Sequence, residues 1–276
     1  MKSDLNGKTV LITGSTDGLG KIVALRLARR GASVLLHGRN QIKGERVMEE
    51  VKSSADTDRV EYYNADFSSL REVKEMADRI IANHSALHLL INNAAVGGGP
   101  RGNKRRELSK DGYELRFAVN YLSHFVLTYR LLPIIRRASP SRIINVASIG
   151  QHPIDFDDIM LERNFDSYRA YAQSKLAQIM FTIDLAEELK GSGIVVNSIH
   201  PATLMNTNMV YEFFGSTMSS VEDGADALEY VATSDETANV TGAYFNRKKK
   251  STAIDQAYDP DARAKLREIS FKLSNG

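Results

Sequence analysis

Short apolar stretches alternate with longer amphipathic segments along most of the chain. The apolar stretches are rich in Val, Ile and Leu on both faces, as expected for buried strands of a parallel sheet. The segments between them repeat apolar residues at helical spacing. The pattern therefore predicts an α/β fold: a doubly wound, parallel seven-stranded sheet with helices on both faces, formed by one domain over residues 1–276. The predicted strands are 8–14, 33–39, 60–67, 87–95, 142–148, 194–201 and 242–246, and the predicted helices are 18–30, 41–54, 71–84, 113–137 and a segment through Tyr171 that ends near 189.

Two segments interrupt this alternation. Residues 96–112 are rich in Gly and charge, and residues 202–220 carry Met, Tyr and Phe among polar residues. Both segments follow predicted strands, so they should lie at the carboxyl edge of the sheet, where such folds bind ligands. We expect 202–220 to form a substrate lid loop. Its apolar side chains and those of the insert 150–166 indicate a substantially apolar substrate, or else they pack the lid onto its own domain.

Composition excludes several classes of protein. The 276 residues are 42% apolar and 25% charged, with a net charge of +2 and no cysteine. Disulfides, cysteine-bound metals and thiol nucleophiles are therefore excluded, and the six histidines lack the spacing of a metal site. No nucleic-acid partner is expected, because the net charge is near zero and the basic runs 104–106 and 247–250 are short. No apolar run could span a membrane and no signal peptide is evident, so a cytoplasmic protein is expected.

A glycine-rich turn joins the first predicted strand to the first helix. It reads TGSTDGLG over residues 13–20. Glycines at such a turn let backbone N–H groups approach a pyrophosphate at the N-terminus of a helix. A plain turn is the structural alternative, but the position between strand and helix favours the dinucleotide site of a Rossmann fold. The residues predicted to contact the dinucleotide here are Gly14, Ser15, Thr16, Asp17, Gly18, Leu19 and Gly20.

Five further motifs follow in order along the chain. NNAA (92–95) ends the fourth strand, and VNYLSHFVLT places Asn120 in a helix. NVAS ends at Ser148, YAQSK places Tyr171 four residues before Lys175, and HPAT (200–203) follows the sixth strand. Together with the glycine turn, these motifs resemble the short-chain dehydrogenase/reductase family over almost the whole chain, and SYRAYAQSKLAQIMF resembles its retinol-dehydrogenase-like branch. Alanine replaces a family glycine at residues 95 and 202, which disfavours a positive φ in those two turns.

The second strand ends with Arg39 and carries no carboxylate. An acidic residue there would bond a ribose 2′-hydroxyl and favour NAD, whereas a guanidinium pairs with a 2′-phosphate. NADP (NADPH) is therefore the predicted cofactor, with NAD as the alternative cofactor and a solvated Arg39 as the structural alternative. Asp17 occupies a position where NADP-using members often carry a basic residue.

The resemblance implies further cofactor contacts. Asp66 matches the aspartate that contacts the adenine, with Phe67 beside it, although Asp66 could instead cap the helix that starts near Ser69. The same resemblance places Asn93, Ala94, Pro201, Thr203, Tyr171 and Lys175 around the rest of the cofactor.

Tyr171 and Lys175 are one helical turn apart. A phenol is ordinarily too weak an acid to serve as a base near neutral pH, and an ammonium beside it favours the phenolate. The resemblance implies that Tyr171 is the general acid/base, that Lys175 bonds the nicotinamide ribose, and that Ser148 holds the substrate oxygen. It also implies that Asn120 anchors a proton path to Lys175. The structural alternative is a half-exposed tyrosine beside a snorkelling lysine.

These residues together predict an oxidoreductase that interconverts a carbonyl and an alcohol on a small molecule by hydride transfer. The main alternative is a non-catalytic NAD(P)-binding regulator, since a fold does not fix a function. Such a regulator should lack the tyrosine or the lysine, and this chain has both. A methyltransferase that uses S-adenosylmethionine would lack Ser148, Tyr171 and Lys175 in this order. The helix surfaces suggest a homodimer, as in many relatives, although the sequence does not fix the oligomeric state.

Overall fold

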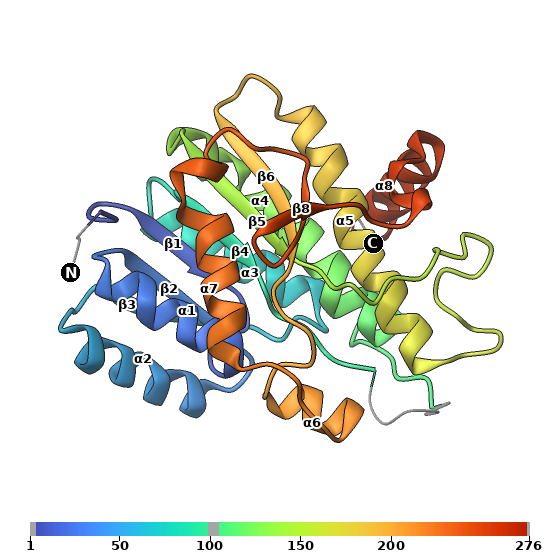
Figure 1. Ribbon diagram of the computed structural model, residues 1–276, viewed down its shortest axis with the longest axis horizontal. Helices are drawn as coiled ribbons and strands as arrows, with labels where there is room; N and C mark the ends of the chain where they lie inside the picture. The colour runs from blue at the N-terminus through green and yellow to red at the C-terminus, as the bar shows by residue number, and fades with distance from the viewer. Residues whose placement is uncertain (1–3, 99–104, 275–276) are drawn as a thin grey trace.

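Eight strands form one sheet in the computed structural model, which describes residues 4–98 and 105–274 (Figure 1). The strand order is β3-β2-β1-β4-β5-β6-β7-β8. The first seven of these strands pair in parallel, which confirms the predicted sheet, and β8 is an additional strand antiparallel to β7. The apolar pattern missed β8 because its residues are polar and exposed. The strands are β1 (Thr9–Ile12), β2 (Ser33–Gly38), β3 (Val60–Asn64), β4 (Leu89–Asn92), β5 (Ser141–Val146), β6 (Ile194–His200), β7 (Tyr244–Asn246) and β8 (Lys249–Ser251).

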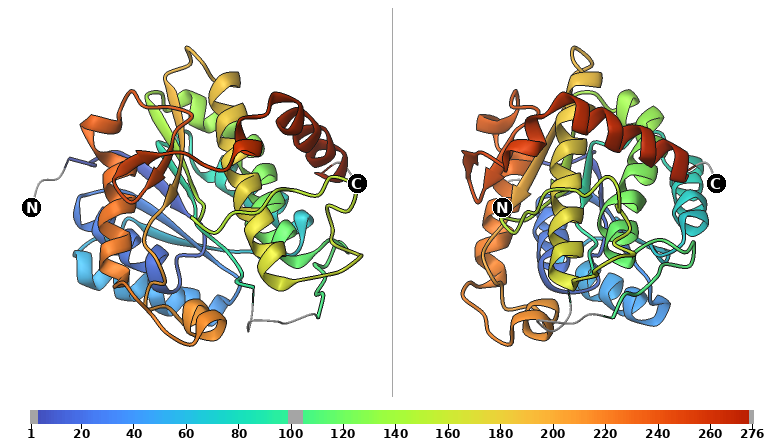
Figure 2. Two further views of the ribbon diagram at one scale, coloured as in Figure 1. Left: turned by 45° about the vertical axis from the view of Figure 1, so that its right-hand side comes forward. Right: turned by 90° about the vertical axis from the view of Figure 1, so that its right-hand side faces the viewer.

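Helices cover both faces of the sheet, as Figure 2 shows. α1 (Gly18–Arg29), α2 (Gln41–Ala55) and α7 (Val221–Thr233) pack with Val10 and Ile12 of β1 into one core. Leu11, which points to the opposite face, packs with the helices of the other layer. That layer contains α3 (Leu70–Asn83), α4 (Ser123–Arg137), α5 (Ser167–Glu188) and α8 (Pro260–Ser274). The remaining helical segments are a π-helix, η1 (Phe117–Leu122), the helix α6 (Asn208–Phe214), and the 3-10 turns η2 (Asp235–Thr237) and η3 (Asp255–Tyr258).

Short polar side chains fix where the helices begin. Asp17, Asn40 and Asp166 accept hydrogen bonds from backbone N–H groups in the first turns of α1, α2 and α5. Ser69 caps α3 by accepting from the N–H of Glu72. The alternative structural role of Asp66 as the cap of this helix is therefore wrong.

The C-terminal helix α8 closes one side of the molecule against α4 and α5 (Figure 1). The Phe271 ring lies 5.0 Å from the ring of Phe125, measured between centroids. The Tyr121 hydroxyl bonds the Ser270 hydroxyl at 2.7 Å, and the Arg263 guanidinium donates to Asp184 at 2.7 Å. The helix is therefore held by aromatic packing and by polar bonds that are largely shielded from water.

The strand order reverses between β1 and β4, because the chain first adds β2 and β3 on one side of β1 and then moves to the other. At such a switch point the loops that follow neighbouring strands separate and leave a crevice at the carboxyl edge of the sheet. The glycine turn follows β1, residues 93–97 follow β4, and Ser148 lies just beyond β5. The topology thus gathers the predicted site at one edge.

Candidate active site

Ser148 and Tyr171 meet at this edge. The Ser148 side chain forms a hydrogen bond with the Tyr171 phenol. The Ser148 hydroxyl also accepts from the N–H of Gly150 at 3.0 Å. The backbone carbonyl of Ser148 accepts from the Tyr244 hydroxyl at 3.1 Å and from the Gln151 side-chain amide at 3.0 Å. The serine is therefore fixed through both its side chain and its backbone.

Lys175 is buried one turn further along α5, with only 2% of its surface exposed. Its Nζ lies 5.7 Å from the centre of the Tyr171 ring. Burial lowers the pKa of Lys175 to about 7. The lysine does not snorkel to solvent, so that structural alternative is wrong.

Burial raises the pKa of the Tyr171 phenol, and the hydrogen bond with Ser148 only partly opposes this rise. The neighbouring Lys175 does not produce the lowered phenol pKa that the sequence led us to expect. The physical reason is that both groups are desolvated, which favours the neutral form of each. The protein's own groups therefore keep Tyr171 protonated at neutral pH.

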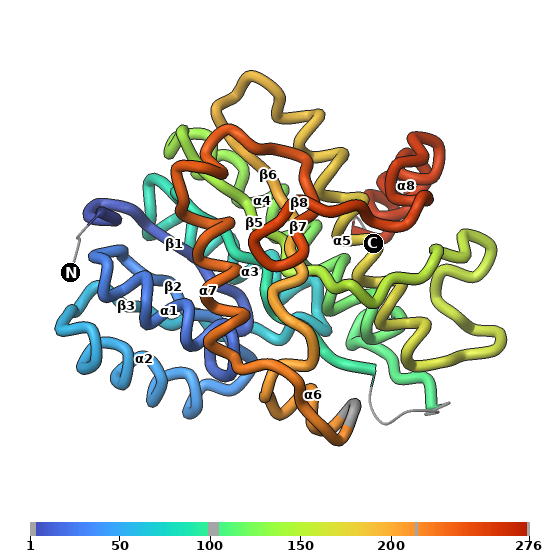
Figure 3. The backbone as a smooth tube through the Cα atoms, in the orientation of Figure 1, coloured from blue at the N-terminus to red at the C-terminus, as the bar shows by residue number. Residues whose placement is uncertain are grey.

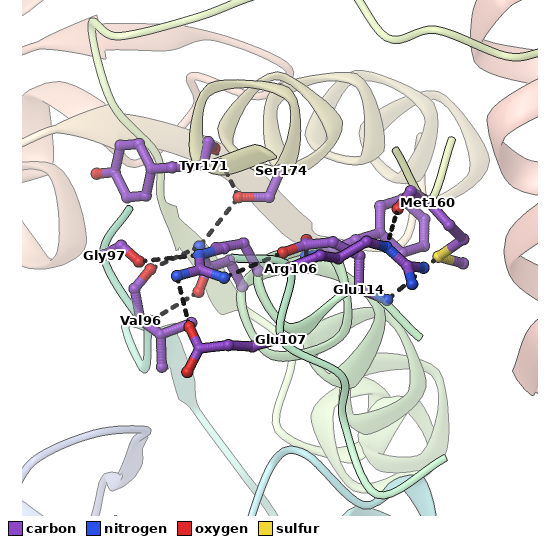
Figure 4. Close-up of polar contacts among 11 residues, drawn as sticks. Val96, Gly97, Arg106, Glu107, Glu114, Met160, Tyr171 and Ser174 are labelled. Carbon is purple, nitrogen blue, oxygen red and sulfur yellow. Dashed lines mark hydrogen bonds and ion pairs between the residues drawn. The ribbon is translucent and has the colours of Figure 1, made fainter. Parts of the chain in front are cut away.

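Asn120 connects the loop after β4 to helix α5 through Val96 and Ser174, two residues that Figure 4 labels. Its Oδ1 accepts from the N–H of Val96 at 2.8 Å, and its Nδ2 donates to the Ser174 hydroxyl at 3.0 Å. Ser174 in turn donates to the carbonyl of Tyr171 at 2.7 Å. Asn120 sits in the π-helix η1, a local departure from α-helical pairing that is frequent at functional sites. Its side-chain hydrogen bonds reach Tyr171 through Ser174, and none of those within the described residues joins it to Lys175.

Arg116 holds the adjacent part of the same loop at Gly97, which Figure 4 labels. Its buried guanidinium donates to the carbonyl of Gly97 at 3.1 Å and pairs with Glu107 at 2.9 Å. It also lies 3.4 Å from Glu114, whose pKa is raised by burial. Residues 99–104 of the predicted irregular segment lie outside the described residues, and its beginning is fixed by Asn120 and Arg116.

The glycine turn has the close-packed backbone that a dinucleotide requires. Gly14 and Gly18 adopt φ of 64° and 49°, a region that L side chains rarely enter. A Cβ on Gly20 would stand 2.7 Å from the Asn93 amide nitrogen and 3.0 Å from Cα of Ser15, and it would also collide with the carbonyl oxygen of Gly14. The turn therefore fits a pyrophosphate at the start of α1, where backbone N–H groups converge. Of the other predicted contacts here, Ser15 and Leu19 are buried and Thr16 lies against Gly38.

His37 supports this turn from below, a role that the sequence analysis missed. Its Nδ1 accepts from the N–H of Gly14 at 3.1 Å, and its Nε2 therefore donates to the carbonyl of Ala65 at 3.1 Å. This pattern requires a neutral ring, and burial lowers the pKa of His37 to about 4. The Phe67 ring stacks on His37 with 4.0 Å between centroids and meets His124 edge-on at 5.5 Å. The side chain of Phe67 thus belongs to the core beneath the turn.

Arg39 is exposed beyond the end of β2 and makes no ion pair with any residue that the structure describes. Lys43, in the first turn of α2, pairs with Asp17 at 2.6 Å and lowers the pKa of that carboxyl. Lys43 therefore offsets the negative charge of Asp17, which is the charge expected to repel a phosphate at the turn. Lys43 is a second basic side chain near this end of β2, and no motif in the sequence indicated it.

Asp66 is fixed at the end of β3. Its carboxylate accepts from the N–H of Ser68 at 3.0 Å and pairs with Lys110 at 3.0 Å. Burial acts to raise the pKa of Asp66, but these bonds outweigh it and the pKa is lowered. The residue is therefore a charged acceptor at the carboxyl edge.

Asn93 and Ala94 join the two strands at the switch point. The Asn93 amide donates to the carbonyls of Thr13 and Gly14 at 2.8 and 3.1 Å, and the Thr13 hydroxyl accepts from the N–H groups of both Asn93 and Ala94. Ala95 has no positive φ, so the alanine that stands in place of the family glycine is not strained by a left-handed backbone.

The turn after β6 is held by His200. Its Nε2 bonds the Thr203 hydroxyl at 3.1 Å, and Pro201 is buried. Ala202 is also buried and lacks a positive φ, so this alanine likewise fits its backbone conformation. Pro201 and Thr203 thus stand in an ordered turn next to the end of β5.

The predicted lid, 202–220, contains α6 and reaches the glycine turn (Figure 3). Asn208 donates to the Asp17 carboxylate at 3.3 Å, and the Thr207 methyl would be 3.1 Å from a Cβ on Gly18. Met205 packs onto the core between α1 and α7, whereas Met218 is 75% exposed. The apolar lid residues therefore divide between packing on the domain and facing outward.

Most of the apolar residues in the insert 150–166 pack against the rest of the domain. Ile154, Phe156, Ile159 and Met160 contact the core around α4 and α5, and Leu161 and Phe165 form a small cluster with Ala170. Ile149, at the start of this region, is instead 55% exposed beside Ser148. No helix among the described residues is long and apolar enough to cross a membrane.

The chain matches the family model described as short chain dehydrogenase over residues 8–215. It is 35% identical to retinol dehydrogenase 13 of Mus musculus over 289 aligned residues, which cover 99% of this chain and 85% of the relative. An uncharacterised protein of Mycobacterium paratuberculosis has a similar structure, with a TM-score of 0.81 and 29% identity over 100% of this chain and 97% of that one.

A second solved structure is described as a short chain dehydrogenase of Escherichia coli CFT073 complexed with NADPH. Its TM-score is 0.74 at 25% identity, over 90% of this chain and all of that one. The family match, the relatives and the fold agree with the resemblance found in the sequence. The chain therefore belongs to the short-chain dehydrogenase family, in its retinol-dehydrogenase-like branch, and is an NAD(P)-dependent oxidoreductase acting on CH–OH or C=O groups.

Proposed function

We propose that this chain is an NADP(H)-dependent oxidoreductase in which Tyr171 is the general acid/base for a fairly apolar carbonyl or alcohol substrate. The observation that carries the proposal is the hydrogen bond between Ser148 and Tyr171, with Lys175 buried one helical turn away. Asn120 supports the arrangement by linking Val96 to Ser174, which bonds the backbone of Tyr171.

The reaction follows from the properties of these side chains. Bound NADPH supplies the hydride that the substrate carbon receives. Tyr171 donates its phenolic proton to the substrate oxygen, and the Ser148 hydroxyl stabilises the charge that develops there. The Lys175 ammonium stabilises the phenolate that remains.

The protonation state of Tyr171 favours carbonyl reduction as the direction in which the chain works near neutral pH. Burial raises the pKa of the phenol, so the side chain holds the proton that reduction consumes. Alcohol oxidation needs the phenolate, which forms more readily as the pH rises. We therefore propose that reduction is the more efficient direction at neutral pH.

The residues proposed to hold the cofactor lie along the switch point. The glycine turn would hold the pyrophosphate, Asp66 the adenine, and Lys175 the nicotinamide ribose. Arg39 and Lys43 would recognise the 2′-phosphate, because both are basic and follow β2. The remaining proposed contacts are Asn93, Ala94, Pro201 and Thr203, with Phe67 acting from the core beneath the turn.

An apolar substrate is supported by the surroundings of Ser148 and Tyr171. Ile149 and Tyr168 flank this pair and are 55% and 45% exposed, so their apolar surfaces are accessible to a substrate bound there. The relative named as a retinol dehydrogenase points the same way, since retinol is an apolar alcohol.

Purified protein should be assayed for NADPH oxidation with aldehydes and ketones of increasing apolar chain length, and with NADH in parallel. We expect carbonyl-dependent oxidation of NADPH, with kcat/KM rising with chain length. Binding of NADPH without turnover of any compound in the series, in either direction, would contradict the proposal and favour the non-catalytic regulator.

Cofactor preference tests the role of Arg39. Arg39→Glu should weaken NADPH binding roughly tenfold to a hundredfold and leave NADH binding little changed, because only NADPH carries the 2′-phosphate. Arg59→Glu is the matched control, since Arg59 precedes β3 at the opposite edge of the sheet. An unchanged ratio of NADPH to NADH affinity in Arg39→Glu would refute the assignment.

A further inference from the structure

Lys175 carries an amine that is buried without a counter-ion among the described residues. Its Nζ donates to the carbonyl of Val146 at 2.8 Å and to Oε1 of Gln178 at 2.9 Å, and no carboxylate of the described residues pairs with it. An ammonium that loses its hydration shell needs acceptors to replace water. One of its two acceptors is backbone, so Gln178 is the side chain on which its solvation depends.

The geometry fixes the orientation of the Gln178 amide. An ammonium only donates hydrogen bonds, so the amide oxygen must face Lys175 and the amide nitrogen must face away. That nitrogen lies 3.4 Å from Nδ1 of His124, a ring that bonds the carbonyl of Asn120 at 3.0 Å and the Thr13 hydroxyl at 3.1 Å. Gln178 is 1% exposed and thus has no room to turn toward solvent.

We propose that Gln178 is a positioning residue that holds the Lys175 ammonium and sets how readily it keeps its proton. This inference rests on the proposed function, in which Lys175 stabilises the Tyr171 phenolate. Gln178 bonds Lys175 directly, so it acts through the lysine.

Three other groups face the lysine from the elements packed around it. Tyr171 lies on the same helix, Val146 presents its carbonyl from β5, and His124 approaches from α4. Burial lowers the pKa of His124 to about 3, so it stays neutral across the working range. Lys175 itself has its pKa lowered to about 7 by burial. A change at residue 178 therefore acts on a group that titrates where the enzyme works.

Two substitutions at this position should move the lysine in opposite directions. Gln178→Met removes the acceptor while keeping similar length, so the Lys175 titration midpoint should fall by roughly one pH unit. Gln178→Glu places a carboxylate at the same distance, so the midpoint should rise by roughly one to three pH units. Gln173→Met is the matched control, because Gln173 is equally buried on α5 but accepts from the N–H of Asp155 at 3.2 Å.

The test is NMR of the full chain labelled at the lysine ε-carbons, without dinucleotide, with the Lys175 signal identified by its loss in Lys175→Arg. The expected order of midpoints is Gln178→Met lowest, then wild type together with Gln173→Met, then Gln178→Glu. The alkaline limb of kcat/KM for carbonyl reduction should follow the same order, because reduction loses the ammonium as the pH rises.

Identical Lys175 midpoints in wild type, Gln178→Met and Gln178→Glu would overturn the proposal. Gln178→Asn serves where the glutamate does not fold, because its shorter amide withdraws the oxygen and should also lower the midpoint. Wild-type turnover together with an unmoved lysine would refute the role of Gln178 alone. Absence of turnover in the wild type would instead refute the proposed function, while the NMR order would still test Gln178.

Discussion

Gly20 is the position where one methyl group tests the dinucleotide turn most sharply. In Gly20→Ala the new Cβ would stand 2.7 Å from the Asn93 amide nitrogen and 3.0 Å from Cα of Ser15, and closer still to the Gly14 carbonyl oxygen. Ordinary contacts of a Cβ begin near 3.4 Å, so the start of α1 and the backbone of Gly14 and Ser15 must move apart by up to about an ångström. Such overpacking costs about 1 to 3 kcal/mol. Because the turn is the proposed pyrophosphate site, NADPH affinity should fall by roughly fivefold to a hundredfold.

The assay is NADPH fluorescence titration, paired with chemical denaturation of the same samples. Gly191→Ala is the control, because Gly191 has a φ of 81° but nothing within 4 Å of its Cβ. That variant should lose about 1 kcal/mol of stability through backbone strain and keep its NADPH affinity. Unchanged NADPH affinity in Gly20→Ala, or equal losses of affinity in both variants, would refute the reasoning.

Two further predictions concern stability. Burial lowers the pKa values of His37, His124 and His200 to about 4, 3 and 4, whereas the unfolded chain binds these protons near pH 6.5. The contribution of these histidines to the free energy of unfolding should therefore be complete above pH 6.5 and decrease as the pH falls toward 4, with about 2 to 3 kcal/mol lost through His37 alone. Denaturation at pH 7 and pH 4.5 measures this loss. A loss that is no smaller in His37→Gln than in the wild type would contradict the prediction. Arg263→Ala should destabilise the protein by about 3 kcal/mol or more, because it leaves the shielded Asp184 unpaired. Arg130 pairs with Asp78 about half exposed to solvent, so Arg130→Ala should cost about 1 kcal/mol or less. Equal denaturation midpoints for these two variants would argue against the role of Arg263 in holding α8.

The parts of the fold that could be predicted are those written in local pattern. The seven apolar strands, the glycine turn and the spacing of Tyr171 and Lys175 depend on residues close together in sequence. The eighth strand could not be predicted, because Lys249–Ser251 pairs with β7 through backbone bonds and buries no side chain. The irregular bond pattern of η1 also leaves no mark in the apolar periodicity of residues 113–137.

The candidate site could likewise be predicted only in part from local sequence. The motif order indicated Ser148, Tyr171 and Lys175, but their electrostatic state depends on burial, which only tertiary packing sets. The sequence does not show that Gly14 is the partner of His37, since one residue belongs to β2 and the other to the turn after β1. A histidine within the apolar stretch 33–39 was the available signal, because a buried polar side chain needs specific partners. Phe67 lies in the core for the corresponding reason: its ring stacks on His37 and meets His124 edge-on, and these histidines come from two other elements.

The central claim is that Tyr171 supplies the proton for carbonyl reduction, and single-turnover NADPH oxidation by Tyr171→Phe tests it most directly. Phenylalanine keeps the ring and removes only the hydroxyl that bonds Ser148. We predict that the variant binds NADPH about as tightly as the wild type, while the rate of NADPH oxidation on mixing with a carbonyl substrate falls by about a hundredfold or more. A variant that binds NADPH and still reduces the carbonyl at a rate within about tenfold of the wild type would contradict the account.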